Sequence, residues 1–331
     1  MKILVTGADG LLGSNLVREL LTRGEEICAF VEPGRQQKTL EGLIVEKVYG
    51  NLLHPEEVIK ATIGRDAVIH CAASTRVWPT RSALVNRINL EGTKNIVNAV
   101  FQNKIKRLIY VGTANSFGFG TKDLPGVESN PYKSEKYGLD YMDSKYKAQQ
   151  FILNEVKEKK LPAIIVNPTF MFGPYDSTPS SGAMIVALHK GKVPGYTSGG
   201  RNYICAKDAA VAIANALTKG RLGECYILGN QNLSYQEAFR KIAATIGVKP
   251  PAISIPPVLA KLYGGISSFI GKISGNTPAI SYPLSKIACD EHYYSAAKAI
   301  AELQLPQTPI EIGIKECFEW LKRNGYLDNK K

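Results

Sequence analysis

The sequence lacks the features that mark several protein classes. None of its six cysteines lies in a Cys-x-x-Cys pair and its four histidines are dispersed, so no metal site is predicted. No apolar run approaches the roughly 18 residues of a membrane span, and stable membrane insertion is not expected. The chain starts with a strand-like Lys2-Ile3-Leu4-Val5 rather than with the segments of a signal peptide. With cysteines among apolar neighbours, these absences favour the reducing cytoplasm.

Acidic residues are few compared with basic ones. The chain has 331 residues, with 41 Lys and Arg against 29 Asp and Glu, which gives a net charge of +12. Such a balance suits nucleic acid, an acidic membrane or an anionic ligand as partner. The basic residues are scattered, and the one dense run at 157–160 is typical of a solvated helix end. Binding of nucleic acid is therefore not expected.

In the first half of the chain, short apolar runs alternate with longer amphipathic stretches. Strands are predicted at 2–6, 26–31, 45–49, 67–71, 107–112 and 163–168, and helices at 11–23, 55–63, 81–103 and 135–160. Apolar runs without polar alternation suit strands that are buried on both faces. The pattern predicts an α/β fold with a doubly wound parallel sheet of the Rossmann type.

After Pro168 the pattern becomes looser. Residues 173–203 predict mainly loop with a short helix at 184–190, and a strand at 226–228 is expected to return to the sheet. Further helices are predicted at 235–246, 257–273, 296–303 and 310–324. We therefore predict a dinucleotide-binding domain at 1–168, joined by 204–230, and a smaller, mostly helical substrate-binding region at 169–203 and 231–331.

A glycine-rich turn, Thr6-Gly7-Ala8-Asp9-Gly10-Leu11-Leu12-Gly13, leads from the first predicted strand into a helix. A turn without β-carbons lets backbone N–H groups approach a pyrophosphate, and the helix N-terminus adds a favourable dipole. The glycines are spaced three and three, unlike those of the GxGxxG motif. Contacts to a dinucleotide are predicted from Gly7, Gly10, Leu11, Leu12 and Gly13.

Glu32 stands at the end of the second predicted strand. A carboxylate in this place accepts hydrogen bonds from the adenosine ribose and repels a 2′-phosphate, which favours NAD. Arg35, three residues later, would instead suit that phosphate, so NADP stays open as the alternative.

Tyr141 and Lys145 are four residues apart in a predicted helix and therefore share one face. A free tyrosine titrates near pH ~10, too high for acid–base work at neutrality. A neighbouring ammonium, or an oxidised nicotinamide ring, favours the phenolate and lowers that pKa. Such pairs also occur by chance in helices, but this one follows five predicted strands and a glycine turn. It indicates proton exchange with a carbonyl or an alcohol.

Together these motifs resemble those of the extended short-chain dehydrogenase/reductase family, also called the NAD-dependent epimerase/dehydratase family. The resemblance covers nearly the whole chain and rests on residues 6–13, 66–73, 89–95, the Tyr141–Lys145 pair and 167–174. It implies that Tyr141 and Lys145 are catalytic, that Thr113 (or, as the alternative, Ser116) orients the substrate oxygen, and that Lys145 also holds the ribose. It further implies cofactor contacts from Asn51, Leu52, Cys71, Ala72, Ala73, Asn89, Pro168 and Thr169.

The family contains reductases, sugar epimerases and dehydratases. Dehydratases resemble one another in a Thr-Asp-Glu run, which is Thr113-Ala114-Asn115 here, so dehydration is not expected. Epimerases tend to carry an Arg and an Asn in the segment that is 167–174 here, where this chain has Asn167 and Phe170. However, Gly200-Arg201-Asn202-Tyr203 resembles the stretch that brings an arginine to a sugar-nucleotide pyrophosphate.

The 173–203 stretch and the tail most resemble the branch of dihydroflavonol reductases and 3β-hydroxysteroid dehydrogenases. The prediction is an NAD(P)-dependent reductase or dehydrogenase of a small hydrophobic ketone or aldehyde and its alcohol. An epimerase with retained NAD and a non-catalytic dinucleotide-binding sensor are the alternatives. The predicted substrate contacts are Trp78, Asn115, Phe117, Phe119, Phe170, Met171, Tyr175, Met184, Tyr196 and Arg201.

Residues 253–273 predict an amphipathic helix that is broken at Gly264-Gly265. Core packing, a mobile lid and contact with a membrane surface are the alternatives for this segment. Members of the family often pair through two long helices, here 81–103 and 135–160, so the resemblance also suggests a homodimer.

Overall fold

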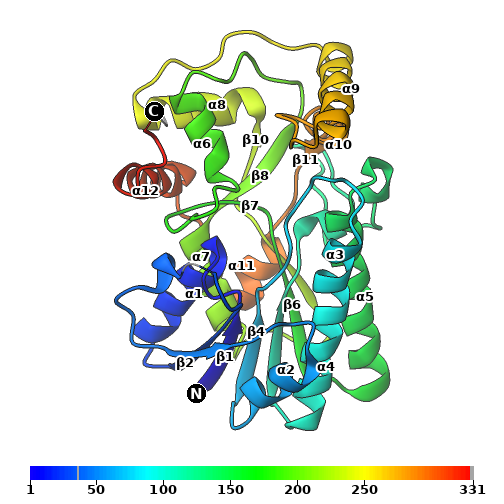
Figure 1. The fold of residues 1–331 in the computed structure, drawn as a ribbon, viewed down its shortest axis with the longest axis vertical. Coiled ribbons are helices and arrows are strands. Elements are labelled where there is room, and N and C mark those ends of the chain that lie inside the picture. Colours follow the sequence, from blue (N-terminus) through cyan, green and yellow to red (C-terminus); the bar gives the residue numbers. More distant parts are fainter. Residues whose placement is uncertain (36, 329–331) are drawn as a thin grey trace.

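The computed structural model describes residues 1–35 and 37–328. Its larger part is built on a seven-stranded sheet in the order β3-β2-β1-β4-β5-β6-β9 (Figure 1). The strands are β1 Lys2–Thr6, β2 Glu26–Val31, β3 Glu46–Tyr49, β4 Ala67–His70, β5 Arg107–Val111, β6 Ala163–Pro168 and β9 Cys225–Leu228. All neighbours pair in parallel. The prediction of a doubly wound parallel sheet is confirmed.

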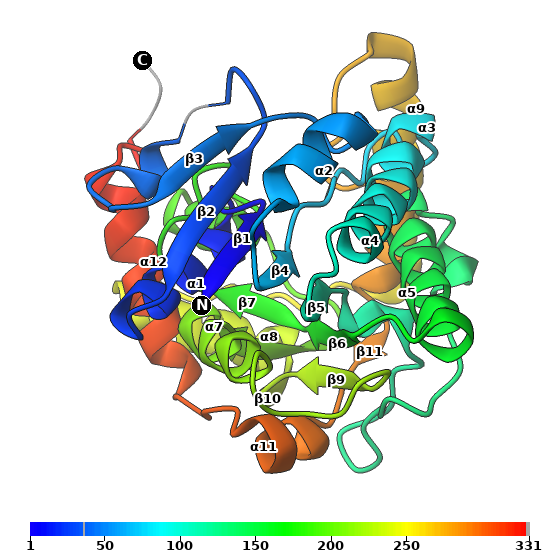
Figure 2. The ribbon, with the colours of Figure 1, turned by 90° about the horizontal axis from the view of Figure 1, so that it is seen from below.

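Helices cover both faces of this sheet (Figure 2). On one face lie α1 Leu11–Thr22, α7 Ala206–Asn215 and α11 Ala297–Leu303; on the other lie α2 Pro55–Thr62, α4 Gly92–Gln102 and α5 Asp140–Lys159. Successive strand residues point to opposite faces, and here both faces are apolar. In β1, Ile3 and Val5 join the core under α1 and α7, whereas Leu4 joins the core under α2, α4 and α5. This two-sided burial explains the uninterrupted apolar runs.

A second, four-stranded sheet was not anticipated from the sequence. It consists of β7 Phe170–Phe172, β8 Gly200–Cys205, β10 Gln231–Ser234 and β11 Glu291–His292. Strand β8 pairs antiparallel with β10 and parallel with β7 and β11. Helices α6 Gly182–His189, α8 Tyr235–Ile246 and α12 Ile310–Arg323 share its core. These strands have two to six residues and carry polar side chains, so their apolar pattern is too short and mixed to be read from sequence.

The predicted helix break at Gly264-Gly265 is wrong. Helix α9 runs without interruption over Pro257–Ser274, and α10, Tyr282–Ile287, packs against it. Gly264 permits this packing, because a β-carbon there would lie 2.4 Å from the Ser285 Oγ. The core-packing alternative for this segment is also contradicted, because α9 exposes its large apolar side chains, for example 75% of Val258. None of the helices in 1–35 and 37–328 is both long enough and apolar enough to cross a membrane.

The two adjacent glycines of α9 provide a matched stability test. Alanine favours a helix over glycine by up to about 1 kcal/mol, and a β-carbon on Gly265 finds no atom closer than 4.0 Å. Gly265→Ala should therefore slow hydrogen–deuterium exchange in α9. Gly264→Ala should speed it, because its β-carbon collides with Ser285. Mass spectrometry of peptides from α9 makes the comparison, and effects of equal sign would contradict the packing described.

Candidate active site

The candidate site lies where the order of the strands reverses. Strand β1 is followed outward by β2 and β3 on one side, and by β4, β5, β6 and β9 on the other. In such sheets ligands bind in the crevice at the carboxyl ends of the strands beside the reversal. The glycine turn follows β1, Cys71–Ala73 follow β4, Thr113 follows β5 and Thr169 follows β6, all at this edge.

The glycine turn is shaped for close approach. Gly7 has a φ of +64°, and a β-carbon there would lie 2.7 Å from the Ala72 Cα, so only glycine lets the turn meet the segment after β4. A β-carbon on Gly13 would lie 2.0 Å from the Gly7 carbonyl oxygen. Gly10 caps α1, no side chain caps that helix, and its first turn holds no acid. The backbone at this N-terminus therefore suits an anion such as a pyrophosphate.

The residues expected near the adenosine lie at the same end of the sheet. Glu32 and Arg35 are exposed after β2, and the Arg35 Nε lies 3.5 Å from an Asp9 carboxylate oxygen. The Asn51 Oδ1 accepts a hydrogen bond from the Leu53 N–H at 2.9 Å. Leu52 packs beside Gly92, whose β-carbon would lie 3.2 Å from the Leu52 Cβ. Arg35 thus lies beside the glycine turn.

Asn89 joins three parts of the site. It lies in a π turn, Arg87–Glu91, between α3 Ala83–Asn86 and α4. Its Nδ2 donates to the Ser74 carbonyl at 3.0 Å and to the Ser144 Oγ at 2.9 Å, and its Oδ1 accepts from the Ser74 N–H at 2.7 Å. The amide is buried, so it holds the loop after β4 against α5.

Lys145 is buried on α5. Its Nζ donates to the Val111 carbonyl at the end of β5 at 2.6 Å, and lies 4.4 Å from the centre of the Tyr110 ring. Burial lowers the pKa of Lys145 to about 7, because a low-dielectric surrounding disfavours the charged form. The ammonium makes no ion pair with a carboxylate of the described residues, and Val111 holds it in place.

Thr113 and Arg201 both act on the phenol of Tyr141. Burial raises the pKa of the Tyr141 phenol, while a hydrogen bond with Thr113 and the charge of Arg201 act to lower it. The Thr113 Oγ1 also accepts a bond from the Asn115 N–H at 3.3 Å. Lys145, expected to lower this pKa, is instead directed at Val111, and Arg201 is the cation whose charge acts on Tyr141.

Arg201 lies among aromatic side chains on β8. Its Nε donates to the Tyr235 hydroxyl at 2.7 Å, and its guanidinium carbon lies 5.1 Å from the centre of the Phe170 ring. Burial works against its charge, but Tyr235, Tyr203 and Tyr294 outweigh this and raise the pKa of Arg201. Arg201 forms no ion pair with an acid of the described chain, so the cleft beside Tyr141 carries an uncompensated positive charge.

The structure divides the predicted substrate residues into three groups: those near the cleft, one farther out, and those that take part in core packing. Phe170 and Asn115 lie close to Arg201 and Thr113 respectively, and the Phe119 ring lies tilted against His292 with ring centres 4.1 Å apart. Trp78 lies farther out, beside Gly271 of α9. The others take part in packing: Phe117 and Met171 against the two cores of the large sheet, and Tyr175, Met184 and Tyr196 in the core of the second sheet.

Sequence reasoning missed two aromatic neighbours of this cleft. The Tyr137 hydroxyl donates to the Asp290 carboxylate and lies 2.9 Å from the His292 Nε2. Burial, followed by the charge of Arg201, lowers the pKa of His292 to about 3, so its ring is neutral at pH 7. The spacing of Tyr137, four residues before Tyr141, and the run His292-Tyr293-Tyr294 were the available signals.

Comparison with known proteins agrees with this geometry. The model of the NAD dependent epimerase/dehydratase family matches residues 3–229. The chain belongs to this family. The resemblance inferred from the motifs is confirmed, and Tyr141, Lys145 and the glycine turn all lie inside the part that matches the epimerase/dehydratase family.

Both reductases and an epimerase are among the similar members of the epimerase/dehydratase family. A putative dihydroflavonol 4-reductase from Synechocystis is 29% identical, over 98% of this chain and 95% of its own. A 2-alkyl-3-oxoalkanoate reductase from Stenotrophomonas maltophilia is 26% identical, over 95% of this chain and 98% of its own. PA4631, a nucleoside-diphosphate-sugar epimerase from Pseudomonas aeruginosa, superposes with a TM-score of 0.81 at 26% identity, over 99% of each chain.

The buried ammonium can be tested through the pH dependence of stability. The pKa of Lys145 is about 7 in the folded chain, against an ordinary value of 10.5. Between these two values the folded chain binds fewer protons than the unfolded chain. The stability of the parent, relative to that of Lys145→Met, should therefore rise with pH across this window and be constant below it.

Urea denaturation of both proteins at several pH values measures this difference. Lys147→Met, which removes an exposed lysine of the same helix, is the matched control and should show no such rise. A difference between parent and Lys145→Met that does not change with pH would show that burial leaves the pKa of Lys145 unshifted.

Proposed function

We propose that the chain is an NAD(P)-dependent oxidoreductase that interconverts a hydrophobic ketone or aldehyde and its alcohol. The observation that carries the proposal is the placement of Tyr141 on α5, one helical turn before the buried Lys145, with the Thr113 side chain acting to lower the pKa of its phenol. A phenol and a second hydroxyl that meet in a cleft can share one substrate oxygen. Names of reductases among the similar proteins support the same chemistry.

The residues at the strand reversal fit a nicotinamide dinucleotide. Gly7 and Gly13, whose β-carbons would collide with Ala72 and with the Gly7 carbonyl, let the turn fold tightly at the N-terminus of α1. That uncapped N-terminus suits the pyrophosphate. Glu32, exposed at the end of β2, suits the ribose hydroxyls and favours NAD, whereas Arg35 is already near Asp9. NADP remains the second choice because Arg35 is exposed. When bound, the cofactor gives or accepts the hydride.

The residues of the catalytic set have separate tasks in this proposal. Tyr141 gives a proton to the substrate oxygen or takes it back, and Thr113 orients that oxygen by a hydrogen bond. Lys145, fixed by Val111, would hold the ribose and add positive charge when protonated. Burial raises the pKa of the Tyr141 phenol, and the charge of Arg201 opposes this rise. Arg201 therefore favours the phenolate, and it cannot itself lose its proton.

Arg201 also indicates the class of substrate. A guanidinium without a carboxylate partner, set among aromatic rings, provides a place for an acidic group in an otherwise apolar cleft. An oxo acid with an apolar chain presents a ketone to Tyr141 and a carboxylate to Arg201. A 2-alkyl-3-oxoalkanoate, the substrate in the name of one relative, has this combination.

The second candidate function is a sugar-nucleotide epimerase with retained NAD. It is favoured by Arg201, which suits a pyrophosphate as well as a carboxylate, and by the likeness to PA4631. Phe170 next to Arg201 argues for an apolar substrate instead. An epimerase would interconvert UDP-sugars without net change of the cofactor.

A homodimer that pairs through α4 and α5, in the cytoplasm, also remains a proposal. Sedimentation of the purified chain would give its mass in solution.

Tyr141→Phe tests the proton transfer. Removing the hydroxyl takes away the acid or base of the reaction, whose contribution is typically about 100-fold or more. We expect kcat for an apolar oxo acid to fall by at least this factor, while the Kd of NADH, measured by fluorescence, changes little.

Tyr146→Phe is the matched control, since this tyrosine lies on the same helix and stacks on Tyr132 instead. It should retain the turnover of the parent. Turnover near the parent level in Tyr141→Phe would remove Tyr141 from the catalytic role and, with it, the proposed mechanism.

Arg201→Gln tests the acidic substrate. Loss of a charge-assisted hydrogen bond should raise KM for a 2-alkyl-3-oxoalkanoate roughly tenfold or more, and should change KM for the corresponding neutral ketone much less. The basic limb of the kcat profile should also move to higher pH, because Arg201 lowers the pKa of Tyr141. Equal changes for acid and neutral ketone would contradict a carboxylate at Arg201, and turnover of UDP-sugars instead would favour the epimerase.

A further inference from the structure

Helix α9 buries its small residues and exposes its large apolar residues, the reverse of an ordinary amphipathic helix. Its buried positions are Gly264, Ser268 and Gly271, which share one face at intervals of four and three residues. Its outward positions carry large apolar side chains; Leu262 is 59% exposed and Phe269 66% exposed. A helix that packs on a protein core has the opposite arrangement. The small residues of α9 pack against the rest of the protein, and its large apolar side chains are directed outward.

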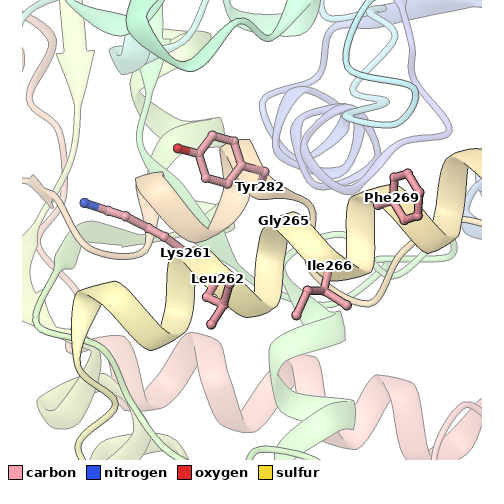
Figure 3. A pocket seen from close by; sticks show the side chains of 6 residues that line it. All are labelled: Lys261, Leu262, Gly265, Ile266, Phe269 and Tyr282. Carbon is pink, nitrogen blue, oxygen red and sulfur yellow. The ribbon is translucent and has the colours of Figure 1, made fainter.

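This surface stands at the margin of the molecule. Figure 1 shows α9 beyond α10, far from the large sheet. Figure 3 shows Leu262, Ile266 and Phe269 projecting from α9, and Tyr282 standing on the neighbouring α10. Large contiguous apolar patches are rare on monomeric proteins and mark interaction sites.

We propose that the outward face of α9, together with Tyr282, docks on the surface of an anionic lipid bilayer. The charges nearby fit this occupant. From Lys249 to Cys289 the chain has lysines but neither Asp nor Glu, and Lys261 and Lys272 are exposed on α9 itself. An apolar helix face flanked by lysines, with aromatic side chains beside it, is the arrangement by which helices lie in the interface of a membrane.

The same charges argue against a second copy of the chain as the occupant. A symmetric pair of α9 helices would bring the lysines of both copies together, and no carboxylate on α9 or α10 would offset them. Anionic headgroups attract these lysines instead, each worth roughly a fivefold change in binding.

The docking face adjoins the candidate active site. Gly271 packs on Trp78, since a β-carbon there would lie 3.2 Å from the Trp78 Cζ2. Leu284 of α10 and Tyr141 both pack against the buried cluster that contains Tyr137. A bilayer held by α9 would therefore lie next to the cleft, where a hydrophobic substrate could enter from the lipid. This delivery of substrate rests on the proposed function, whereas the docking itself does not.

Flotation of the full chain with vesicles tests the docking without any activity measurement. Phosphatidylcholine vesicles that contain phosphatidylglycerol should carry the parent upward, and pure phosphatidylcholine vesicles should carry much less. The variant Leu262→Gln/Ile266→Gln/Phe269→Gln should lose roughly tenfold or more of the binding, because binding scales with buried apolar area. Lys261→Gln/Lys272→Gln should lose binding to the anionic vesicles only.

The matched control replaces three exposed apolar residues elsewhere. Ile44, Leu124 and Leu222 are 94%, 79% and 52% exposed, and Ile44→Gln/Leu124→Gln/Leu222→Gln should bind vesicles as the parent does. Thermal unfolding checks that each variant is folded. A parent that does not float, or an α9 variant that floats equally well, would overturn the proposal. So would a parent dimer that the α9 variant converts to a monomer without any vesicle binding, since a second copy would then cover this face.

Discussion

Two cations that no carboxylate of the described residues neutralises define the cleft around Tyr141. Burying an unpaired charge is costly, and a protein can relieve the cost by loss of the proton or by hydrogen bonds and aromatic faces. Lys145 illustrates the first solution, because burial lowers its pKa to about 7. Arg201 cannot lose its proton, and tyrosines surround it instead. The cleft is therefore prepared for anionic partners, which a dinucleotide and an acidic substrate both provide.

The position of Arg201 depends on its neighbour in β8. The Asn202 Oδ1 accepts bonds from the Thr169 hydroxyl at 2.8 Å and from the Asn230 N–H at 3.0 Å, and its Nδ2 donates to the Asn232 Oδ1 at 2.7 Å. Thr169 follows β6 and Asn230 follows β9, so this one amide joins the second sheet to the edge of the first. Because neighbouring strand residues point to opposite faces, fixing Asn202 also fixes the face on which Arg201 lies.

The sequence allowed the residues of this site to be predicted, Arg201 among them, but concealed how Arg201 acts on Tyr141. The glycine turn, Thr113 and the Tyr141–Lys145 pair are local features, since each follows a strand buried on both faces or lies on one helix. Arg201 acts through space, and its strand has a mixed polar pattern that was read as loop. The Gly264-Gly265 pair was read as a helix break because glycine weakens an isolated helix. Contact with Ser285 of α10 decides that local structure, and no local pattern reports such a contact.

The exposure of large apolar side chains on α9 follows from the same close packing. A helix that approaches α10 through Gly264 and Ser268 cannot also place large side chains in that contact, so its apolar residues must face away from the protein. Exposing them to water is unfavourable, yet the alternative, a conventional amphipathic helix, would separate α9 from α10. Since Leu284 of α10 packs against the same buried cluster as Tyr141, that separation would loosen the wall of the cleft. The geometry of the catalytic helix and the apolar outer surface thus depend on one set of small residues.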